Sequence, residues 1–462
     1  MDRLRFDFGN LMAERVENGV ASERLETDLA VRFREAHEAV EARRATGDLG
    51  FLDLPYATET VDQVVEIADG YAQWFEDVVV LGIGGSGLGA TVLKEALLGP
   101  FWNSRDDEGR DHFPRLHIVD NPDPFTYSAL LSQLDPARTM FNVVSKSGST
   151  TETMAQYLVA REWVESGVDP DKARGHFLFT TDPEHGALRQ IGEAEEIPML
   201  PVPSNVGGRF SVLSPVGLLP AAACGIDPRA LLQGAAEMEQ RCATGALSEN
   251  PAGLLAVLLH QADTEQARPI HVLMPYADRL APVARWFQQL WAESLGKAVT
   301  MSGEYRNTGP TPVAALGATD QHSMFQLLME GPQDKVVIFV CVDDVGVDMP
   351  IPERHPGISA LSYLGGHSLG ELLSVEHAAT AEALRRVGRP NATFTVPRVD
   401  AQSLGELLML LQLATVYAGG LYGVDPMDQP GVELGKRLTY GLMGGAGADR
   451  PELEESDSRW VR

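Results

Sequence analysis

Lysine, and positive charge in general, is scarce in this sequence of 462 residues. It has 37 lysine and arginine residues against 65 aspartate and glutamate residues, and its formal net charge is −28. Because such a surface repels nucleic acid and anionic membranes, we expect neither as a partner. An anionic ligand must meet a locally positive pocket, and the few lysines are Lys94, Lys146, Lys172, Lys297, Lys335 and Lys436.

Cysteine is also rare, with 3 residues in the chain. Cys224, Cys242 and Cys341 are odd in number, lie far apart and lack CxxC or Cys/His spacing, so we expect no disulfide framework and no metal site. No run reaches the roughly 18 apolar residues that span a bilayer, and the charged N-terminal residues do not resemble a signal peptide. These absences predict a soluble protein of the reducing cytoplasm.

The length and the order of apolar runs predict an α/β fold. A chain of 462 residues is too long for one core, so we expect two lobes of roughly 200 residues each. Short β-rich runs alternate with helical stretches, which is typical of parallel sheets covered by helices on both faces. The first series lies at 78–81, 116–119, 140–144 and 176–179, and the second, after a helical interval, at 270–274, 298–301, 336–340 and 392–396.

Helical segments flank the two series. Residues 22–45 have apolar residues at helical spacing and predict an N-terminal helical layer. The Pro-, Gly- and His-rich passage 344–368 predicts a surface insertion, and 444–462 a polar tail. We therefore predict four parts: an N-terminal helical segment 1–70, a first lobe 71–225, a second lobe 226–400, and a C-terminal helical segment with its tail at 401–462.

A loop rich in hydroxyl groups follows the strand predicted at 140–144. Glycine at position 148 permits positive φ, and the helix that follows directs its N-terminus at the loop, so backbone N–H groups converge there. This arrangement favours an anion site, above all for phosphate, and the nearby Lys146 supports it. The alternative is a cluster that only caps the helix. The hydroxyl residues are Ser145, Ser147, Ser149, Thr150 and Thr151.

A glycine-rich loop follows the strand predicted at 78–81. Gly82, Gly84 and Gly87 match GxGxxG, so a dinucleotide site has to be considered. Asp120, the candidate ribose ligand, follows at more than the roughly 20 residues expected, which weakens that hypothesis. With Ser86 in the loop, a second phosphate or sugar contact is the other functional interpretation, and a tight turn is the structural one.

One arginine and one glutamate stand out in the middle of the chain. Arg209 follows the glycine pair 207–208 and stays charged at any working pH, although an arginine here can also be purely structural. Glu293 and Gln289 lie one turn apart on a helix predicted at 282–297, beside a stripe of apolar residues. A carboxylate beside such a stripe gains basicity, as a general base requires. The alternative is an ordinary exposed pair of Glu293 with Lys297.

Two more candidates lie near predicted helix starts. His322 falls in the first turn of an apolar helix, where the helix dipole keeps an imidazole neutral and available for proton transfer. Most histidines are only packing or surface residues, however. Lys436 follows Gln429 and Pro430 on another helix and, taken alone, is an ordinary solvated lysine.

Taken together, these stretches resemble the phosphoglucose isomerase family, in their order along the chain. The resemblance implies two doubly wound sugar-isomerase (SIS-type) lobes with a site in the cleft between them. It implies an aldose-ketose isomerase that interconverts glucose 6-phosphate and fructose 6-phosphate, without cofactor or metal. The stretches are 82–86 (GIGGS), 145–150 (SKSGST), 207–211 (GGRFS), 293–297 (ESLGK), 321–322 (QH) and 429–436 (QPGVELGK).

The resemblance also assigns roles by position. Glu293 matches the base that moves a proton between C1 and C2, and Arg209 the residue that stabilises the enediolate. His322 and Lys436 match the groups that open the sugar ring. The family's phosphate and sugar contacts fall on Ser145, Lys146, Ser147 and Thr150, on the loop at Gly84, Gly85 and Ser86, and on Gln289 and Gln429. Gly148 stands where animal members have a bulkier phenylalanine, which resembles the bacterial branch.

The family further implies a homodimer in which His322 of one chain serves the site of its neighbour. Two alternatives share the fold. A dual-specificity phosphoglucose/phosphomannose isomerase also accepts the C2 epimer, and a sugar-phosphate-sensing regulator binds without turnover. A regulator should lack Glu293, His322 or Lys436, and all three are present.

Overall fold

The computed structural model describes residues 3–447, 450–454, 456 and 459–460. The chain forms two compact units, Met1–Pro426 and Met427–Arg462, and each is described by itself. The four predicted parts, with limits at residues 70, 225 and 400, stay predictions. The α/β fold class with parallel sheets is confirmed.

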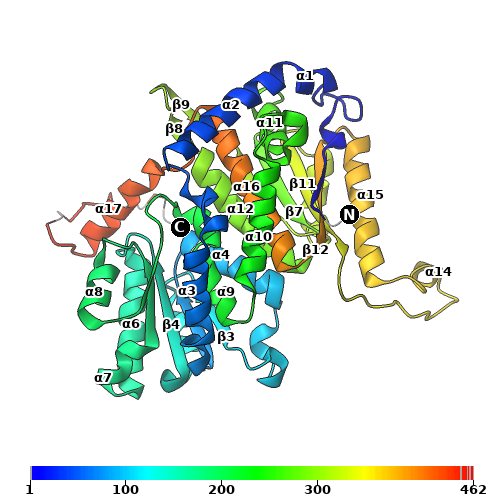
Figure 1. The fold of residues 1–462 in the computed structure, drawn as a ribbon. Coiled ribbons are helices and arrows are strands. Elements are labelled where there is room, and N and C mark those ends of the chain that lie inside the picture. The colour runs from blue at the N-terminus through cyan, green and yellow to red at the C-terminus, as the bar shows by residue number, and fades with distance from the viewer. Residues whose placement is uncertain (1–2, 448–449, 455, 457–458, 461–462) are drawn as a thin grey trace. The chain divides into compact units, whose positions relative to one another are not determined.

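The first sheet is entirely parallel. Its inner strands are buried apolar runs, as expected for strands covered on both faces. All four runs of the first predicted series form strands, and the structure adds a short fifth one, β6, at the edge. In spatial order the strands are β3 (Arg115–Val119), β2 (Asp77–Leu81), β4 (Thr139–Ser145), β5 (Phe177–Thr181) and β6 (Met199–Pro201) (Figure 1).

Successive side chains along these strands point to opposite faces of the sheet and belong to two hydrophobic cores. Val79 and Phe141 pack under one layer of helices, whereas Val78 and Met140 pack under the other. The first layer has α5 (Pro124–Leu131), α6 (Thr151–Gly167), α7 (Pro170–Ala173) and α8 (Ala187–Glu195), and the second has α3 (Thr58–Asp69), α4 (Gly85–Leu93) and α9 (Pro215–Ala223).

The second sheet is mixed. Four parallel strands are flanked by an antiparallel N-terminal strand, and the spatial order is β1 (Arg5–Asp7), β12 (Asn391–Arg398), β11 (Lys335–Asp344), β7 (Ile270–Pro275) and β10 (Thr311–Ala314). The assignment of 298–301 to this series is wrong. Those residues overlap β8 (Lys297–Val299), which pairs with β9 (Tyr305–Thr308) in a separate two-stranded sheet, and the missing sheet strand is β10. The run at 298–301 is largely exposed, so its β-branched residues did not mark a sheet core.

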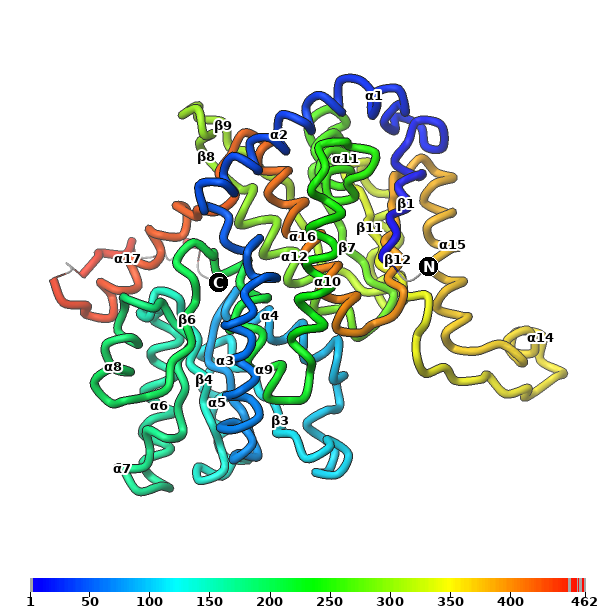
Figure 2. The backbone as a smooth tube through the Cα atoms, in the orientation of Figure 1, coloured from blue at the N-terminus to red at the C-terminus, as the bar shows by residue number. Residues whose placement is uncertain are grey.

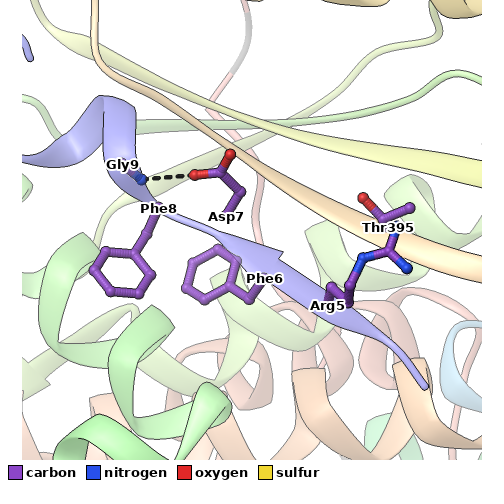
Figure 3. A pocket seen from close by; sticks show the side chains of 6 residues that line it. All are labelled: Arg5, Phe6, Asp7, Phe8, Gly9 and Thr395. Carbon is purple, nitrogen blue, oxygen red and sulfur yellow. Dashed lines mark hydrogen bonds between the residues drawn. The ribbon is translucent and has the colours of Figure 1, made fainter. Parts of the chain in front are cut away.

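The N-terminal strand β1 lies along β12, as both the tube and the register show (Figure 2). A surface pocket of about 600 Å³ opens here. It is lined by residues 5–9 and Thr395, and Asp7 accepts a hydrogen bond from the backbone of Gly9 at 2.9 Å (Figure 3). None of the predicted site residues lines it.

Helices pack on both sides of the second sheet. The helix predicted at 22–45 is divided at Thr27 into two helices, and the helix predicted at 282–297 ends at Leu295, before Lys297. The helices are α1 (Ser22–Glu26), α2 (Asp28–Ala45), α10 (Pro228–Arg241), α11 (Pro251–Thr264), α12 (Ala281–Leu295), α13 (Gln321–Glu330), α15 (Leu369–Arg386) and α16 (Ala401–Tyr422).

Helix α16 is the central element of this packing and contacts α2, α10, α11 and α12. Within the described residues it is the one helix long and apolar enough to cross a membrane. It is not the uninterrupted run of about 18 apolar residues that the sequence was expected to lack, because polar residues such as Glu406 and Gln412 interrupt it. Of its apolar window, 89% is buried inside the protein, as in a core helix.

The passage 344–368 is a largely exposed insertion, as predicted, with one short helix, α14 (Ser359–Ser362). In the C-terminal unit, a turn at Pro430–Val432 leads into α17 (Glu433–Leu442). Part of the predicted polar tail, at residues 448–449, 455, 457–458 and 461–462, lies outside the described residues.

Candidate active site

The two loops singled out in the sequence meet at one edge of the first sheet. The chain passes from β2 to β3 on one side and then to β4 on the other, so the strand order reverses between β2 and β4. Leu81, which precedes the glycine loop, pairs with Val143, two residues before Ser145. In open α/β sheets, ligands bind at the carboxyl ends of the strands at such a reversal.

The glycine loop packs against residues from two distant stretches. Gly84 has φ of 58°, which favours glycine, and a Cβ atom there would lie 3.0 Å from Nε2 of Gln289. At Gly85 an added Cβ would lie 2.2 Å from the backbone of Gly208. The loop therefore carries Ser86 into the first turn of α4 and brings the predicted sugar and arginine residues to the edge of the sheet.

The hydroxyl groups after β4 bond to one another. Oγ of Ser145 lies 2.8 Å from Oγ1 of Thr150, and Oγ of Ser147 lies 3.4 Å from the same atom. Thr150 is the N-cap of α6, but its side chain makes no capping hydrogen bond. Gly148 has φ of 62°. The hydroxyls thus gather in front of the helix without closing it, which favours the anion site over the capping alternative.

Lys146 points elsewhere in this structure. Its Nζ donates to the carbonyl oxygen of Ser204 at 2.7 Å. Burial lowers the pKa of Lys146, and the negative charge of Asp182 opposes that shift. The lysine is the neighbour of the hydroxyl cluster along the chain, but its ammonium group does not contact those hydroxyls.

Arg209 is buried and fixed by several acceptors. It lies in the turn Gly208–Leu213, 3% exposed, where its Nε donates to Oγ of Ser294 at 2.7 Å and its Nη2 donates to the carbonyl oxygen of Pro426. Its Nη1 lies 3.2 Å from Oε1 of Glu293. The guanidinium thus binds a backbone carbonyl, as in the structural alternative, and also a carboxylate, as a catalytic role requires.

Glu293 lies in the last turn of α12, and its side chain is 27% exposed. Nε2 of Gln289 donates to Oε2 of Glu293 at 3.1 Å, so the two carboxylate oxygens have different partners. Glu293 and Lys297 do not form the exposed ion pair that was the alternative. Lys297 is buried and donates to the backbone carbonyl oxygens of Glu293 and Ser294, at 2.8 Å each.

His322 is the second residue of α13, as predicted, and is exposed. Its neighbour Gln321 is fixed by hydrogen bonds to the hydroxyls of Tyr276 and Thr380, at 2.6 and 2.8 Å. No hydrogen bond joins the imidazole of His322 to the part of the chain that the structure describes, and none joins it to Glu293.

Two of the predicted residues belong to the C-terminal unit. Gln429 immediately precedes the turn Pro430–Val432. Lys436 lies on α17, where its Nζ donates to Oε1 of Glu433 at 2.8 Å. Within the described ranges, no group of three His, Cys, Asp or Glu side chains has the arrangement of a metal site.

Sequence reasoning missed two residues at this site. Ser294 holds the guanidinium of Arg209, and Lys297 holds the end of the helix that carries Glu293. Both belong to the stretch 293–297, so the match to that stretch was a signal. Their partners, however, follow from tertiary packing.

Comparisons with known proteins identify the family of the chain. A family profile for phosphoglucose isomerase matches residues 66–450. A glucose-6-phosphate isomerase from Rubrobacter xylanophilus is 45% identical over 452 residues, which are 97% of this chain and 99% of that protein. The crystal structure of a hypothetical protein from Thermus thermophilus has 38% identity and a TM-score of 0.84, covering 96% of this chain and 100% of that one. A glucose-6-phosphate isomerase from Chlamydia trachomatis has 25% identity and a TM-score of 0.72, covering 84% and 73%. The chain belongs to the phosphoglucose isomerase family.

Proposed function

We propose that this chain is a glucose-6-phosphate isomerase of glycolysis and gluconeogenesis, which interconverts glucose 6-phosphate and fructose 6-phosphate through an enediolate. The relatives that cover nearly its whole length bear that name. The observation that carries the proposal is the 3.2 Å contact between the buried guanidinium of Arg209 and the accessible carboxylate of Glu293. This contact supports the proposal because the reaction requires a cation beside a base.

The two residues have complementary roles. In the open-chain aldose, Glu293 takes the proton from C2, and the electron pair forms the C1–C2 double bond while the carbonyl at O1 becomes an oxyanion. The proton returns to C1 and O2 becomes the new carbonyl, once the hydroxyl proton has moved from O2 to O1. Arg209 stabilises the negative charge that exists only in the intermediate and the transition states, so it lowers the barrier.

We assign the phosphate group to the hydroxyl cluster in front of α6. Ser145, Ser147 and Thr150 supply hydroxyl donors, and the helix N-terminus favours a dianion. The loop at Gly84, Gly85 and Ser86 contributes across the strand reversal. Lys146 directly follows Ser145, so its ammonium group can leave the carbonyl oxygen of Ser204 and bind an incoming phosphate.

The remaining groups handle the sugar itself. Oε1 of Gln289 is buried and has no hydrogen-bond partner in the described chain, so a sugar hydroxyl can satisfy it. We assign ring opening to His322 and Lys436, and a second orienting amide to Gln429. Because His322 is exposed and free of hydrogen bonds to its own described chain, we propose that it serves a second copy in a homodimer with shared sites.

A coupled assay tests the proposal directly. Purified chain with fructose 6-phosphate, glucose-6-phosphate dehydrogenase and NADP should give NADPH, and excess EDTA should leave the rate unchanged. Lack of turnover under both conditions would contradict the function. Mannose 6-phosphate in a parallel assay separates the dual-specificity alternative. The free thiols of Cys224, Cys242 and Cys341 are compatible with the cytoplasmic location that we propose.

A further inference from the structure

Helix α12 ends at Leu295, two residues after Glu293, so its last carbonyl groups lack donors within the helix. Lys297 supplies donors to two of these carbonyl groups. This residue is 8% exposed, and its Nζ donates to the carbonyl oxygens of Glu293 and Ser294 at 2.8 Å each. A buried ammonium group is costly unless its donors are used. One of the few lysines of this chain thus fixes the backbone at Glu293, the proposed catalytic base.

Ser294 performs a matching task for the guanidinium. It is fully buried, and its Oγ accepts a hydrogen bond from Nε of Arg209 at 2.7 Å. The guanidinium is planar, so acceptors at Nε and at Nη2 fix the plane and leave the Nη1 edge directed at Glu293. Without the acceptor at Nε, the plane can rotate about the side-chain bonds.

We infer that Ser294 and Lys297 are positioning residues for the isomerisation, an inference that rests on the proposed function. Ser294 acts through Arg209 and fixes the position at which the guanidinium contacts the negative charge of the enediolate. Lys297 acts through the backbone and sets where the carboxylate of Glu293 stands. Catalytic groups have to be held within about 0.5 Å of the productive geometry, and these two contacts help to hold Arg209 and Glu293 in place.

The first experiment removes each contact. Ser294→Ala deletes the acceptor, and Lys297→Met keeps the length and deletes the ammonium. We expect kcat to fall by about 10- to 100-fold in each, with KM for fructose 6-phosphate within about twofold, because the supported interactions are made in the transition state. Thr415→Val, at a buried hydroxyl bonded to its own helix, and Lys335→Met, at a half-buried lysine paired with Asp334, are the matched controls and should keep wild-type kcat.

The second measurement separates positioning from general loosening. Arabinonate 5-phosphate places a carboxylate where the enediolate oxygens form, whereas inorganic phosphate reports only on the phosphate site. In Ser294→Ala the dissociation constant of the first should rise by about the factor that kcat loses, and that of phosphate should not change. A variant that is only destabilised weakens both ligands together or neither, and that result would overturn the inference.

A double-mutant cycle tests the route through Arg209. Lysine has no Nε–H donor of the guanidinium kind, so in an Arg209→Lys background the further change Ser294→Ala should cost less than about twofold. An unchanged full cost in that background, or wild-type kcat in both single variants, refutes the positioning roles while leaving the enzyme's activity intact. An inactive wild-type chain would instead refute the proposed function, and binding of arabinonate 5-phosphate to Ser294→Ala still reports on the guanidinium.

Discussion

Gly85 and Gly208 are in direct backbone contact, so close that a Cβ atom on Gly85 would lie 2.2 Å from the carbonyl of Gly208. Real Cβ atoms essentially never approach other atoms to less than 3.0 Å. The contact joins the loop at the sheet edge to the turn that begins with Gly208 and carries Arg209. The position of Arg209 therefore depends on the absence of a side chain at Gly85.

Replacing Gly85 by alanine should displace that turn. We expect kcat/KM to fall by at least about 100-fold and the free energy of unfolding to fall by roughly 1–3 kcal/mol, the usual cost of overpacking. Steady-state kinetics and urea unfolding measure the two effects. Gly175→Ala is the control, because an added Cβ at Gly175 meets open space. Wild-type kinetics in Gly85→Ala would show that the turn can move without harm.

Glu293→Gln keeps the shape of the side chain and removes the base. We expect kcat to fall by roughly 10²–10⁴, the usual contribution of a positioned acid–base group, with substrate still bound. Exchange of the C2 hydrogen with deuterated solvent, followed by NMR, should fall in parallel. If exchange continued at the wild-type rate, another residue would be the base.

The phosphate assignment predicts a different kinetic signature. Ser147→Ala combined with Thr150→Ala removes two hydroxyls that face the anion site, so KM for both hexose phosphates and the inhibition constant of free phosphate should rise together. Ser166→Ala, near the other end of α6, where the hydroxyl donates to the carbonyl oxygen of Trp163, should change neither constant. Unchanged values in the double variant would place the phosphate elsewhere.

The shared-site dimer predicts complementation. Glu293→Gln chains and His322→Ala chains, each inactive alone, are refolded together and assayed. In a mixed dimer with shared sites, one site collects both defects and the other is wild type, so about half of the activity per mixed dimer returns. If His322 served its own chain, every site would keep one defect and the mixture would stay inactive.

A buried histidine predicts the dependence of stability on pH. Burial lowers the pKa of His271 from 6.5 to about 3, and its Nδ1 accepts a hydrogen bond from Trp291. The unfolded chain takes up a proton below pH 6.5 that the folded chain cannot accept. The stabilisation is therefore complete above about 6.5 and is lost as the pH falls toward 3, at up to about 1.4 kcal/mol per pH unit.

Urea unfolding between pH 7.5 and pH 5 measures this slope. His271→Asn can keep an acceptor for Trp291 and removes the titration, so its stability should fall less steeply than that of the wild type. His260 and His377, whose burial also lowers the pKa to about 4, keep a residual slope. His355→Asn, at an exposed histidine, is the control, and equal slopes in all three proteins would contradict the prediction.

The sequence predicted the α/β fold class and most strands because buried parallel strands are continuous apolar runs. It failed where the burial of a segment and its β propensity disagree. Thr311–Ala314 is short and contains Pro312, so it did not read as a strand, yet β10 completes a sheet. The run at 298–301 has stronger β propensity, but it is exposed and joins a two-stranded ribbon.

The sequence predicted the loops that meet at the sheet edge, but it did not predict most of the side-chain contacts there. Local order, such as His322 at a helix start and Gly148 with positive φ, follows from residue type and spacing. The bond from Arg209 to Ser294 joins residues 85 positions apart. The link from Lys146 to Ser204 is also tertiary, so its position depends on how the chain folds back and no local pattern specifies it.

Helix α16 also determines when the larger unit can finish folding. It packs against α2, α10, α11 and α12, and it follows all four of them along the chain. At roughly 5–20 residues per second, a ribosome spends tens of seconds on this chain before Tyr422 emerges, and the apolar faces of those earlier helices stay without their partner until then. We therefore expect chains truncated at residue 400 to be captured by chaperones instead of forming a stable core.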